Sequence, residues 1–350
     1  MAIKLKDVAR QSGYSITTVS RALAGYSDVN EQTRRHIIEV ASSLGYQPNL
    51  PARQLRIRRT NSLGLVIPAR DHSYSNEFFS QLLMGIGDAA AQSGYDLLIG
   101  AQAPGEAEMA CYRRMVGGNL VDGVILVRTR RHDERIAYLS QQQIPFMVFG
   151  RAAPGEPCNF SFIDIDSQAA IRALVDHFTG LGHRRIGLIL PPEEMAFTPY
   201  RLAGYQEGLE NAGLPYDPAR VVTGDLLRSG GEQGARILLD RDPKITAIIA
   251  CNDLMALGAM RAIESLNLQV GRDIAVAGYD DIPAAEYAYP SLTTIHQPIY
   301  EIGQRLVTLL LDQIEGRNSA HSAVFLPYTL VVRASSGAPR QEGGAQPESS

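Results

Sequence analysis

The stretch "LKDVARQSGYSITTVSRAL", residues 5–23, predicts two short helices joined by a tight turn. Gly13 can adopt the left-handed backbone conformation that ends many helices, and Ser15 can begin the next helix as an N-cap. Ala9 is small enough to let the two helices approach closely, and Val19 can pack in the angle between them. This spacing is typical of a helix-turn-helix, which we therefore expect here.

A third helix is predicted directly downstream, in "EQTRRHIIEVASSLG". Asn30 can cap its start, and Gly45 can end it. Its apolar residues recur at helical spacing and would close a small core, namely Ile37, Val40, Ala41 and Leu44. We therefore expect residues 1–47 to fold as an all-α head.

The charge of the chain is divided unevenly between this head and the rest. Residues 1–60 carry 10 lysines and arginines against 4 acids, a net charge of +6. The remaining residues carry 23 basic against 33 acidic side chains, a net of −10, and the whole chain has −4. A small basic head on an acidic body favours a polyanionic partner for the head, although a solvated charge run is the alternative on charge alone.

The second helix carries candidate DNA contacts on the face away from the predicted core, namely Ile16, Thr17, Thr18, Ser20 and Arg21. The N-terminal residues of a recognition helix enter the major groove. Arg21 can bond O6 and N7 of a guanine, the threonines can bond base edges or phosphate, and Ile16 can touch a thymine methyl. The alternative is a helical hairpin with one exposed isoleucine. The basic charge and the third helix favour DNA binding.

The segment "YQPNLPARQLRIRRTNS" follows the head, and Pro48 marks the boundary. Asn49 can cap a helix that is too short to be stable alone in water. Four arginines surround Leu55, which suits an element that orders only on DNA, with Leu55 as an apolar wedge between base steps. We expect residues 48–60 to form a hinge helix, with a plain basic linker as the alternative.

From Ser62 onward, short apolar strands alternate with helical patterns. The predicted strands cover residues 62–68, 96–100, 122–127, 144–149, 162–166, 185–190, 245–251 and 273–279. Helices are predicted over residues 76–94, 167–182, 200–213 and 252–266. Near-continuous apolar strands linked by helices are typical of parallel sheets covered on both faces. The pattern predicts an α/β body of two subdomains, with a ligand in the cleft at the carboxyl ends of the strands.

Several classes of function find no support in the sequence. The first residues lack the apolar region of a secretory signal, and no run of about 18 apolar residues could cross a bilayer. Three scattered cysteines argue against a disulfide scaffold and favour a reducing cytosol. The match of "GIGDAA" (residues 85–90) to a dinucleotide fingerprint falls within a helical pattern instead of at a strand-to-helix turn. We expect a cytoplasmic protein that is not an enzyme and has no catalytic residues, metal or cofactor.

Short polar side chains follow two of the predicted strands. Asn252 and Asp253 come directly after one strand, and Asp280 and Asp281 come after another. Acidic and amide groups at such positions can orient several hydrogen bonds to a hydroxyl-rich ligand in a concave site. For Asn252 or Asp281 alone, capping of a helix is the simpler interpretation.

In this combination of features the chain resembles the lactose repressor/galactose repressor (LacI/GalR) family of transcription regulators. The resemblance runs from about Leu5 to about Arg333. It rests on many segments in order, among them "LKDVARQSGYSITTVSRAL", "GYQPNLPARQL", "NEFF", "DGVIL", "RLAGYQEGL", "CNDLMALGAM" and "VAGYDDIPAAEYAYPSLTTIHQP". It implies a core like that of periplasmic sugar-binding proteins, with two doubly wound parallel-sheet subdomains. It also implies a homodimer on a pseudo-palindromic operator, controlled by a small-molecule effector, most often a sugar or glycoside.

The resemblance also assigns site residues. It places base contacts at Ile16, Thr17 and Arg21, and the hinge candidates are Asn49, Ala52 and Leu55. It places effector contacts at Phe79, Arg151, Arg201, Asn252, Asp280 and Gln297. Arg201 would offer a planar fork to ligand hydroxyls, and Phe79 would supply a ring face.

The predicted domains are a head (1–47), a hinge (48–60), a core (61–334) and a disordered tail (335–350) rich in Gly, Pro and Ser. Within the core, we expect one subdomain from 61–161 with 292–322 and a second from 162–291 with 323–334. The sequence thus predicts a repressor that binds double-stranded operator DNA, without a membrane association. The alternative is a cytosolic sugar-binding protein without a regulatory role. Inducer and corepressor remain equally open, because linkage allows either sign.

Overall fold

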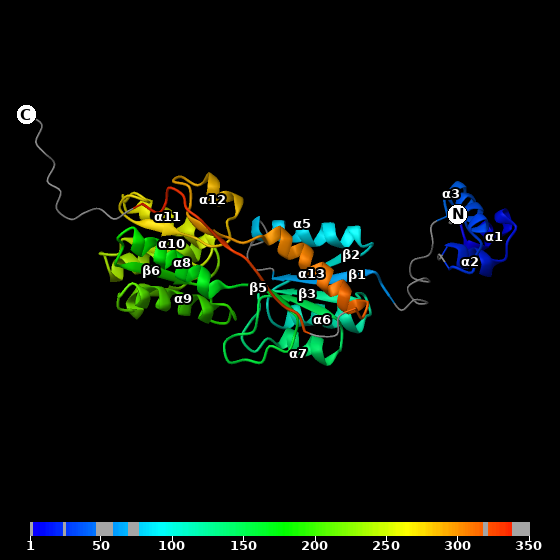
Figure 1. The fold of residues 1–350 in the computed structure, drawn as a ribbon, viewed down its shortest axis with the longest axis horizontal. Coiled ribbons are helices and arrows are strands. Elements are labelled where there is room, and N and C mark those ends of the chain that lie inside the picture. The colour runs from blue at the N-terminus through cyan, green and yellow to red at the C-terminus, as the bar shows by residue number, and fades with distance from the viewer. Residues whose placement is uncertain (1–2, 24–25, 47–58, 69–76, 318–320, 338–350) are drawn as a thin grey trace, which may run out of the picture. The chain divides into compact units, whose positions relative to one another are not determined.

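The computed structural model describes residues 3–23, 26–46, 59–68, 77–317 and 321–337 (Figure 1). It divides into two compact units, residues 1–60 and residues 61–350. This division falls where the sequence predicts the start of the core. The hinge candidates Asn49, Ala52 and Leu55 lie outside the described residues.

The described residues of the head form three helices, α1 (Leu5–Ser12), α2 (Ile16–Leu23) and α3 (Glu31–Ser43). The predicted turn and caps are present. Gly13 follows α1 with a φ of 75°, the Ser15 hydroxyl accepts the N–H of Thr18 at 3.1 Å, and the Asn30 side chain accepts the N–H of Gln32 at 2.8 Å. The buried core is made of Val8, Ala9, Val19, Ala22, Val29, Ile37 and Ala41. The predicted helix-turn-helix is therefore confirmed.

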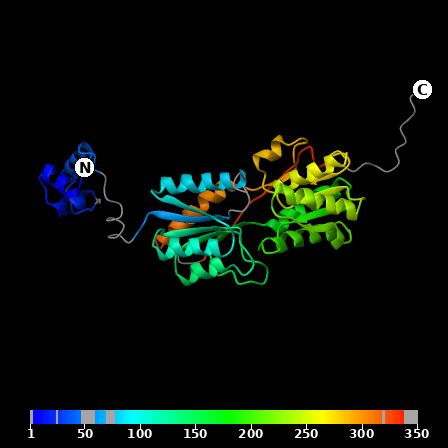
Figure 2. The same cartoon turned by 180° about the vertical axis from the view of Figure 1, so that it is seen from behind.

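A six-stranded sheet forms the first subdomain, with the strand order β11-β5-β4-β3-β1-β2 and parallel pairing throughout. Its strands are β1 (Ser62–Pro68), β2 (Asp96–Gln102), β3 (Gly123–Val127), β4 (Phe146–Phe149), β5 (Phe162–Ile165) and β11 (Ala323–Leu326). Helices α5 (Glu77–Gln92) and α13 (Ile299–Ile314) cover one face, and α6 (Glu106–Gly117) and α7 (Glu134–Gln141) cover the other (Figures 1 and 2). Each face buries its own apolar core, as a sheet covered on both sides requires.

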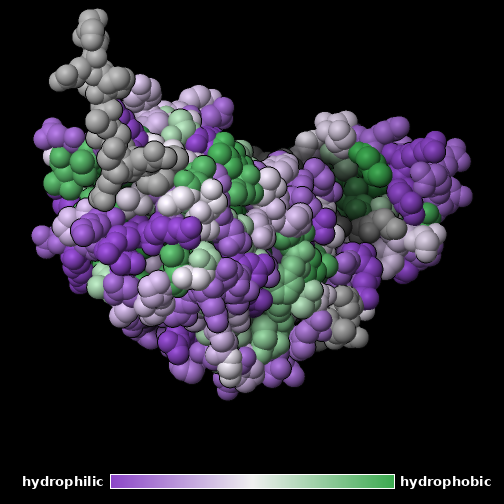
Figure 3. All heavy atoms as spheres, turned by 60° about the vertical axis from the view of Figure 1, so that its left-hand side comes forward, coloured by the Kyte–Doolittle hydropathy of each residue, from purple (hydrophilic) through white to green (hydrophobic). Residues whose placement is uncertain are grey.

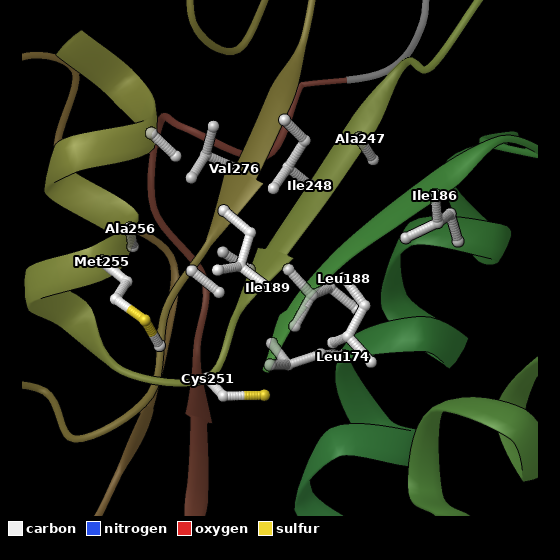
Figure 4. Packing of buried hydrophobic residues seen from close by; sticks show 14 of the residues in the cluster. Leu174, Ile186, Leu188, Ile189, Ala247, Ile248, Cys251, Met255, Ala256 and Val276 are labelled. Carbon is white, nitrogen blue, oxygen red and sulfur yellow. The ribbon is translucent and has the colours of Figure 1, made fainter. Parts of the chain in front are cut away.

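A four-stranded parallel sheet forms the second subdomain, in the order β7-β6-β8-β9. Its strands are β6 (Ile186–Leu190), β7 (Val221–Thr223), β8 (Ala247–Ala250) and β9 (Ala275–Ala277), and a short 3-10 helix (Pro218–Arg220) precedes β7. Helices α8 (Ser167–Gly180) and α9 (Thr198–Asn211) lie on one face, and α10 (Arg228–Arg241) and α11 (Asp253–Ser265) lie on the other. Figure 4 shows Leu188, Ile189, Ile248 and Val276 of the strands packed with Met255 of α11 in this core. The predicted α/β fold with two parallel sheets is confirmed.

Three strands lie in a different subdomain from the one that the sequence predicts. β5 and β11 pair with each other and β5 pairs with β4, so both belong to the first sheet instead of the second subdomain. β10 (Thr294–His296), predicted in the first subdomain, pairs antiparallel with β12 (Thr329–Val331), and Ile295 lies in the core of the second. The chain therefore passes from the first subdomain to the second after β5, returns to the first after β10, and passes to the second again after β11. A short helix, α12 (Pro283–Tyr287), precedes β10.

The predicted disordered tail begins too early. Ser335 is fully buried, its hydroxyl donates to the carbonyl oxygen of Val276 at 2.7 Å, and it accepts the N–H of Thr293 at 2.8 Å. Ser335 is thus held against β9, because its hydroxyl donates to the carbonyl oxygen of Val276 and its own carbonyl oxygen accepts the N–H of Val276. The rest of the predicted tail, residues 338–350, lies outside the described residues.

The face drawn in Figure 3 is mostly hydrophilic, with apolar patches among the polar side chains. The most exposed large apolar side chains are Tyr287 and Tyr289, near α12. In the part of the chain that the structure describes, no helix is long and apolar enough to span a membrane.

Candidate effector pocket and DNA-binding head

A pocket lies where the strands of the two core sheets end, and its empty volume is about 700 Å³. Its walls are Phe78, Val127, Arg128, Phe149, Gly150, Asp164, Ser167, Phe197, Arg201, Leu226, Asn252, Tyr279, Asp280 and Gln297. Both sheets contribute, since Val127 and Phe149 end β3 and β4 whereas Asn252 and Tyr279 follow β8 and β9. A mostly apolar pocket with a few convergent polar groups is the usual form of a small-molecule site.

Four of the six predicted effector residues meet in this pocket: Arg201, Asn252, Asp280 and Gln297. The amide of Gln297 donates to Asp280 Oδ1 at 2.7 Å, so these two side chains orient each other. The amide of Asn252 donates to the carbonyl oxygen of Leu226 at 3.0 Å, while its oxygen caps α11 by accepting the N–H of Met255 at 2.9 Å. Asn252 is therefore both a cap and a pocket residue, which reconciles the two interpretations of its position.

Arg201 enters the pocket from the first turns of α9 with an exposed fraction of only 7%. Its guanidinium donates through Nη1 to the carbonyl oxygen of Cys251 and lies 4.0 Å from the ring centre of Tyr279 and 4.6 Å from that of Phe197. Its Nε is buried without a hydrogen-bond partner in the described residues. A guanidinium that is held by two rings and one carbonyl oxygen has a fixed orientation.

The structure places Phe79, a predicted effector contact, in the core and its neighbour Phe78 in the pocket wall. Phe79 is 4% exposed and packs in the core of the first subdomain, and the pocket wall is formed by Phe78. Adjacent helical residues point about 100° apart, so only one of the two can face the ligand while the other faces the sheet. The Phe78 ring stacks on Phe149, with ring centres 6.1 Å apart and planes 10° apart.

Arg151 lies beside the pocket but is not part of its wall. Its Nε is 3.3 Å from Asp164 Oδ2, and its guanidinium lies 3.8 Å from the ring centre of Tyr200. Asp164 itself lines the pocket. Arg151 therefore contacts a residue of the pocket wall without lining the pocket itself.

Two ionisable wall residues were missed from the sequence. Asp164 comes from the interior of β5, and Arg128 follows β3 with the unusual φ of 54°. The guanidinium of Arg128 lies 4.8 Å from the ring centre of Phe79. The signal for Arg128 was its position directly after a predicted strand, the same signal that identified Asn252.

Burial dominates the electrostatics of the pocket. It raises the pKa of Asp164 to about 6 despite the opposing effect of Arg151, and it lowers the pKa of Arg128 to about 10. Burial and the neighbouring Asp253 both raise the pKa of Asp280, while Arg201 opposes them. The pKa of Asp253 is itself raised to about 7 by burial, although Thr294 and the Ile282 N–H bond its carboxyl group. Low local polarity strengthens any hydrogen bond that a ligand makes here.

In the head, the predicted recognition helix presents Ile16 with an exposed fraction of 53%. Arg21 forms an ion pair with Asp28, and its guanidinium lies 5.3 Å from the ring centre of Tyr26. The hydroxyls of Ser15 and Thr18 are 2.9 Å apart, so Thr18 is engaged at the start of α2. The apolar face of α2 is buried through Val19 and Ala22, which leaves the predicted contact face outward.

Within the described residues, no group of three or more His, Cys, Asp and Glu side chains could hold a metal ion. A helix-turn-helix head with an outward second helix, carried by a chain whose α/β core contains a polar-lined pocket, defines a DNA-binding regulator with a small-molecule site.

Comparisons with known proteins agree with this class. Residues 4–49 match the profile "Bacterial regulatory proteins, lacI family", and residues 175–336 match "Periplasmic binding protein-like domain". The HTH-type transcriptional regulator CelR of Thermobifida fusca is 33% identical over 332 residues, which cover 95% of this chain and 97% of the relative. The chain belongs to the lacI family of transcription regulators.

Two solved structures extend the comparison. A transcriptional regulator CelR–cellobiose complex is similar with a TM-score of 0.75 and 32% identity, covering 95% of this chain and 99% of that one. The lac repressor dimer bound to operator and the anti-inducer ONPF is similar with a TM-score of 0.85 and 29% identity, covering 97% and 100%.

Proposed function

We propose that this chain is a homodimeric repressor that binds a pseudo-palindromic operator through its heads and responds to an uncharged sugar in the core pocket. The observation that carries the effector class is the convergence of Arg201, Asn252 and Asp280 beside aromatic rings. Guanidinium, amide and carboxyl groups can bond several hydroxyls at once, and ring faces can cover the apolar face of a sugar. The cellobiose complex of a similar protein supports this class.

The ionisable groups of the pocket favour an uncharged ligand. Arg128 and Arg201 are matched in number by Asp164 and Asp280. A hydroxyl can donate to a carboxylate and accept from a guanidinium, so an uncharged polyol uses groups of both kinds. A phosphate or carboxylate would bring an anion close to Asp164 in a site of low polarity, which is costly.

We propose that the head contacts DNA through the residues predicted from the sequence. Arg21, with Ile16, Thr17, Thr18 and Ser20 beside it on α2, would read base edges in the major groove. Because Asp28 pairs with Arg21 in the head, Arg21 would exchange this carboxylate for a guanine on the operator. The hinge candidates Asn49, Ala52 and Leu55 would act at the centre of the operator, with Leu55 as the wedge.

A thermal-shift screen of the full-length protein tests the effector class, with neutral mono- and disaccharides, nucleosides and sugar phosphates as ligands. We expect a neutral sugar to raise the melting temperature, since a ligand at 100 times its Kd stabilises by about 2.7 kcal/mol. Repeating the screen with an operator selected from random duplexes reports whether the sugar releases or strengthens DNA binding.

Arg201→Leu is the matched variant for this screen. It should weaken sugar binding by about 2–3 kcal/mol, because ligand hydroxyls lose a charged partner in a buried site. Operator affinity without sugar should persist, since Arg201 belongs to the core. Arg185→Leu, which removes a half-exposed arginine paired with Asp242, is the control. A shift caused only by nucleosides or sugar phosphates, or undiminished sugar affinity in Arg201→Leu, would contradict the proposal.

A further inference from the structure

The loop after β3 touches both the pocket and the opposite subdomain. Residues 129–131 pair with residues 194–196, which follow β6 in the second subdomain, through an antiparallel bridge between Arg130 and Met195. The N–H of Arg131 donates to the carbonyl oxygen of Glu194 at 2.8 Å, and the N–H of Ala196 donates to that of Thr129 at 2.9 Å. This bridge is a backbone connection between the two subdomains, and it lies one residue from the Arg128 side chain in the pocket.

A buried cluster of charged side chains binds this loop. The guanidinium of Arg135 donates to Asp133 Oδ2 at 2.6 Å and to Glu108 Oε1 at 3.0 Å. It also donates to the carbonyl oxygens of Arg128 and Val127, at 2.8 Å and 3.3 Å. Arg135 thus joins two carboxylates to the backbone at the point where β3 ends.

The same carboxylates bind the loop directly. Glu108 Oε2 accepts from Nη1 of Arg130 at 2.7 Å, and Asp133 Oδ2 accepts the N–H of Arg130 at 3.0 Å. The side chains of Glu108, Asp133 and Arg135 are 0%, 2% and 1% exposed. Their charges therefore act in a medium of low polarity. In such a medium the loss of a partner or of good hydrogen-bond geometry is costly, so the observed contacts are strongly favoured.

Stability alone does not account for this cluster. A buried ion pair gives little net stability compared with apolar residues of similar volume, because desolvation offsets the Coulomb attraction. The cluster does fix an unusual backbone. Arg128 has a φ of 54°, a left-handed conformation that costs a non-glycine residue free energy and persists only where the surroundings impose it. The carbonyl oxygen of that same residue is bound by Arg135.

We propose that Glu108, Asp133 and Arg135 form a positioning cluster that fixes residues 128–131, presents Arg128 to the effector and joins this pocket wall to the second subdomain. The part that concerns the effector rests on the proposed function, whereas the part that concerns the bridge does not. Arg135 touches neither ligand nor DNA in this arrangement and acts through the loop. Occupancy of the pocket and contact between the subdomains would thereby depend on the same few residues.

Hydrogen–deuterium exchange of the full-length protein, without sugar or DNA, tests the cluster. Arg135→Lys keeps the positive charge but loses the planar fork that binds two carboxylates and two carbonyl oxygens together. We expect the amides of Arg131 and Ala196 to exchange about tenfold faster in this variant while β8 keeps its protection, because only a local contact opens. Failure of the sugar screen would leave this result unaffected, so the two proposals are tested separately.

Three further variants make the result specific. Arg220→Met removes a partly buried arginine that pairs with Asp242 in the second subdomain, and it should leave both amides at the wild-type rate. Arg128→Gln removes the side chain from the pocket but keeps the loop backbone, so exchange should again be unchanged. Glu108→Gln keeps the side-chain volume but removes one charge, and it should accelerate exchange at Arg131 and Ala196, though less than Arg135→Lys.

Two results would overturn the proposal. One is wild-type exchange at the bridge amides in Arg135→Lys or in Glu108→Gln. The other is faster exchange throughout the core in both variants, including β8, because the cluster would then support general stability instead of the loop.

Discussion

At the level of single residues, the sequence predicts pocket residues that directly follow a strand. It does not predict those whose place in the pocket depends on the direction of the side chain. Asn252 and Asp280 were identified because short polar residues at strand ends converge in a parallel sheet. The resemblance points to Phe79, but sequence alone does not fix which of Phe78 and Phe79 turns towards the pocket. Asp164 was missed because an acid inside an apolar strand reads as part of the strand.

Asp164 makes the stability of the core depend on pH. Its side chain is 12% exposed, and burial raises its pKa from the ordinary 3.8 to about 6. Between these values the folded protein binds more protons than the unfolded chain. The contribution of this group to stability is therefore fully present below about pH 4 and is lost as the pH rises through about 6.

Asp164→Asn cannot titrate at this position, so it should remove that dependence. The free energy of unfolding of the wild type, taken relative to the variant, should fall between pH 4 and pH 7 by at most about 3 kcal/mol. Urea unfolding at intervals over this range measures the difference, in which the shared titration of Asp253 and Asp280 largely cancels. The exposed Asp240 provides the control Asp240→Asn. Parallel wild-type and Asp164→Asn curves would refute the assignment.

At the level of elements, the eight predicted strands are all present, because most are runs of buried apolar residues between turn signals, although β2 at the sheet edge is largely exposed or half-buried. The strands that were missed, β7, β10, β11 and β12, each contain exposed or half-buried positions, whereas the equally short β9 is buried throughout and lies in a longer apolar run. Helix α10 was missed for a different reason. It begins with "RSGGEQG", and glycine has a low helix propensity, so only packing against another helix makes this segment helical.

The contact between α10 and α11 supplies that packing. At Gly258 of α11 the backbones of the two helices lie in close contact. A Cβ atom at Gly258 would overlap the carbonyl oxygen of Arg228 at the start of α10. Backbone atoms cannot move aside as a flexible side chain can, so Gly258→Ala should destabilise the protein by about 1–3 kcal/mol.

The control for this variant is Gly87→Ala. Gly87 lies within α5, and nothing lies within 4 Å of the Cβ atom it would gain. This substitution should be neutral or stabilise by about 0.5–1 kcal/mol through helix propensity. Denaturant midpoints of both variants give the comparison. Equal stabilisation by the two alanines would show that the helices are not in close contact at Gly258.

At the level of the whole molecule, the sequence predicts the division into a head and a core more reliably than the boundaries between the two subdomains of the core. The head and the core are separate units with their own apolar cores, and the charge divides at the same place. The subdomain boundaries were misplaced because the chain passes between the two sheets more than once, and strand pairing rather than order along the chain decides where β5 and β11 belong.

The uneven charge leads to a prediction about DNA binding. Residues 1–60 have a net charge of +6, and the rest of the chain has −10. Contacts of the head with phosphates release counterions, so the logarithm of operator affinity should fall linearly with the logarithm of salt concentration, with a slope of about −0.9 for each phosphate neutralised. The acidic remainder should be repelled by DNA, most strongly at low salt, because its like charge opposes approach and salt screens this repulsion.

A fragment of residues 61–350 separates the two contributions. It retains all three buried clusters of the core, so it should unfold cooperatively and keep the sugar response of the full-length protein. It should lose operator binding entirely, whereas Arg21→Ala in the full-length chain should cost only about 1–3 kcal/mol and relax preference at one base pair per half-site. Fluorescence anisotropy with labelled operator between 50 and 200 mM salt, a range over which phosphate contacts lose much of their affinity, measures all three proteins. Operator binding by the fragment would place the DNA-binding surface on the core and remove the head from that role.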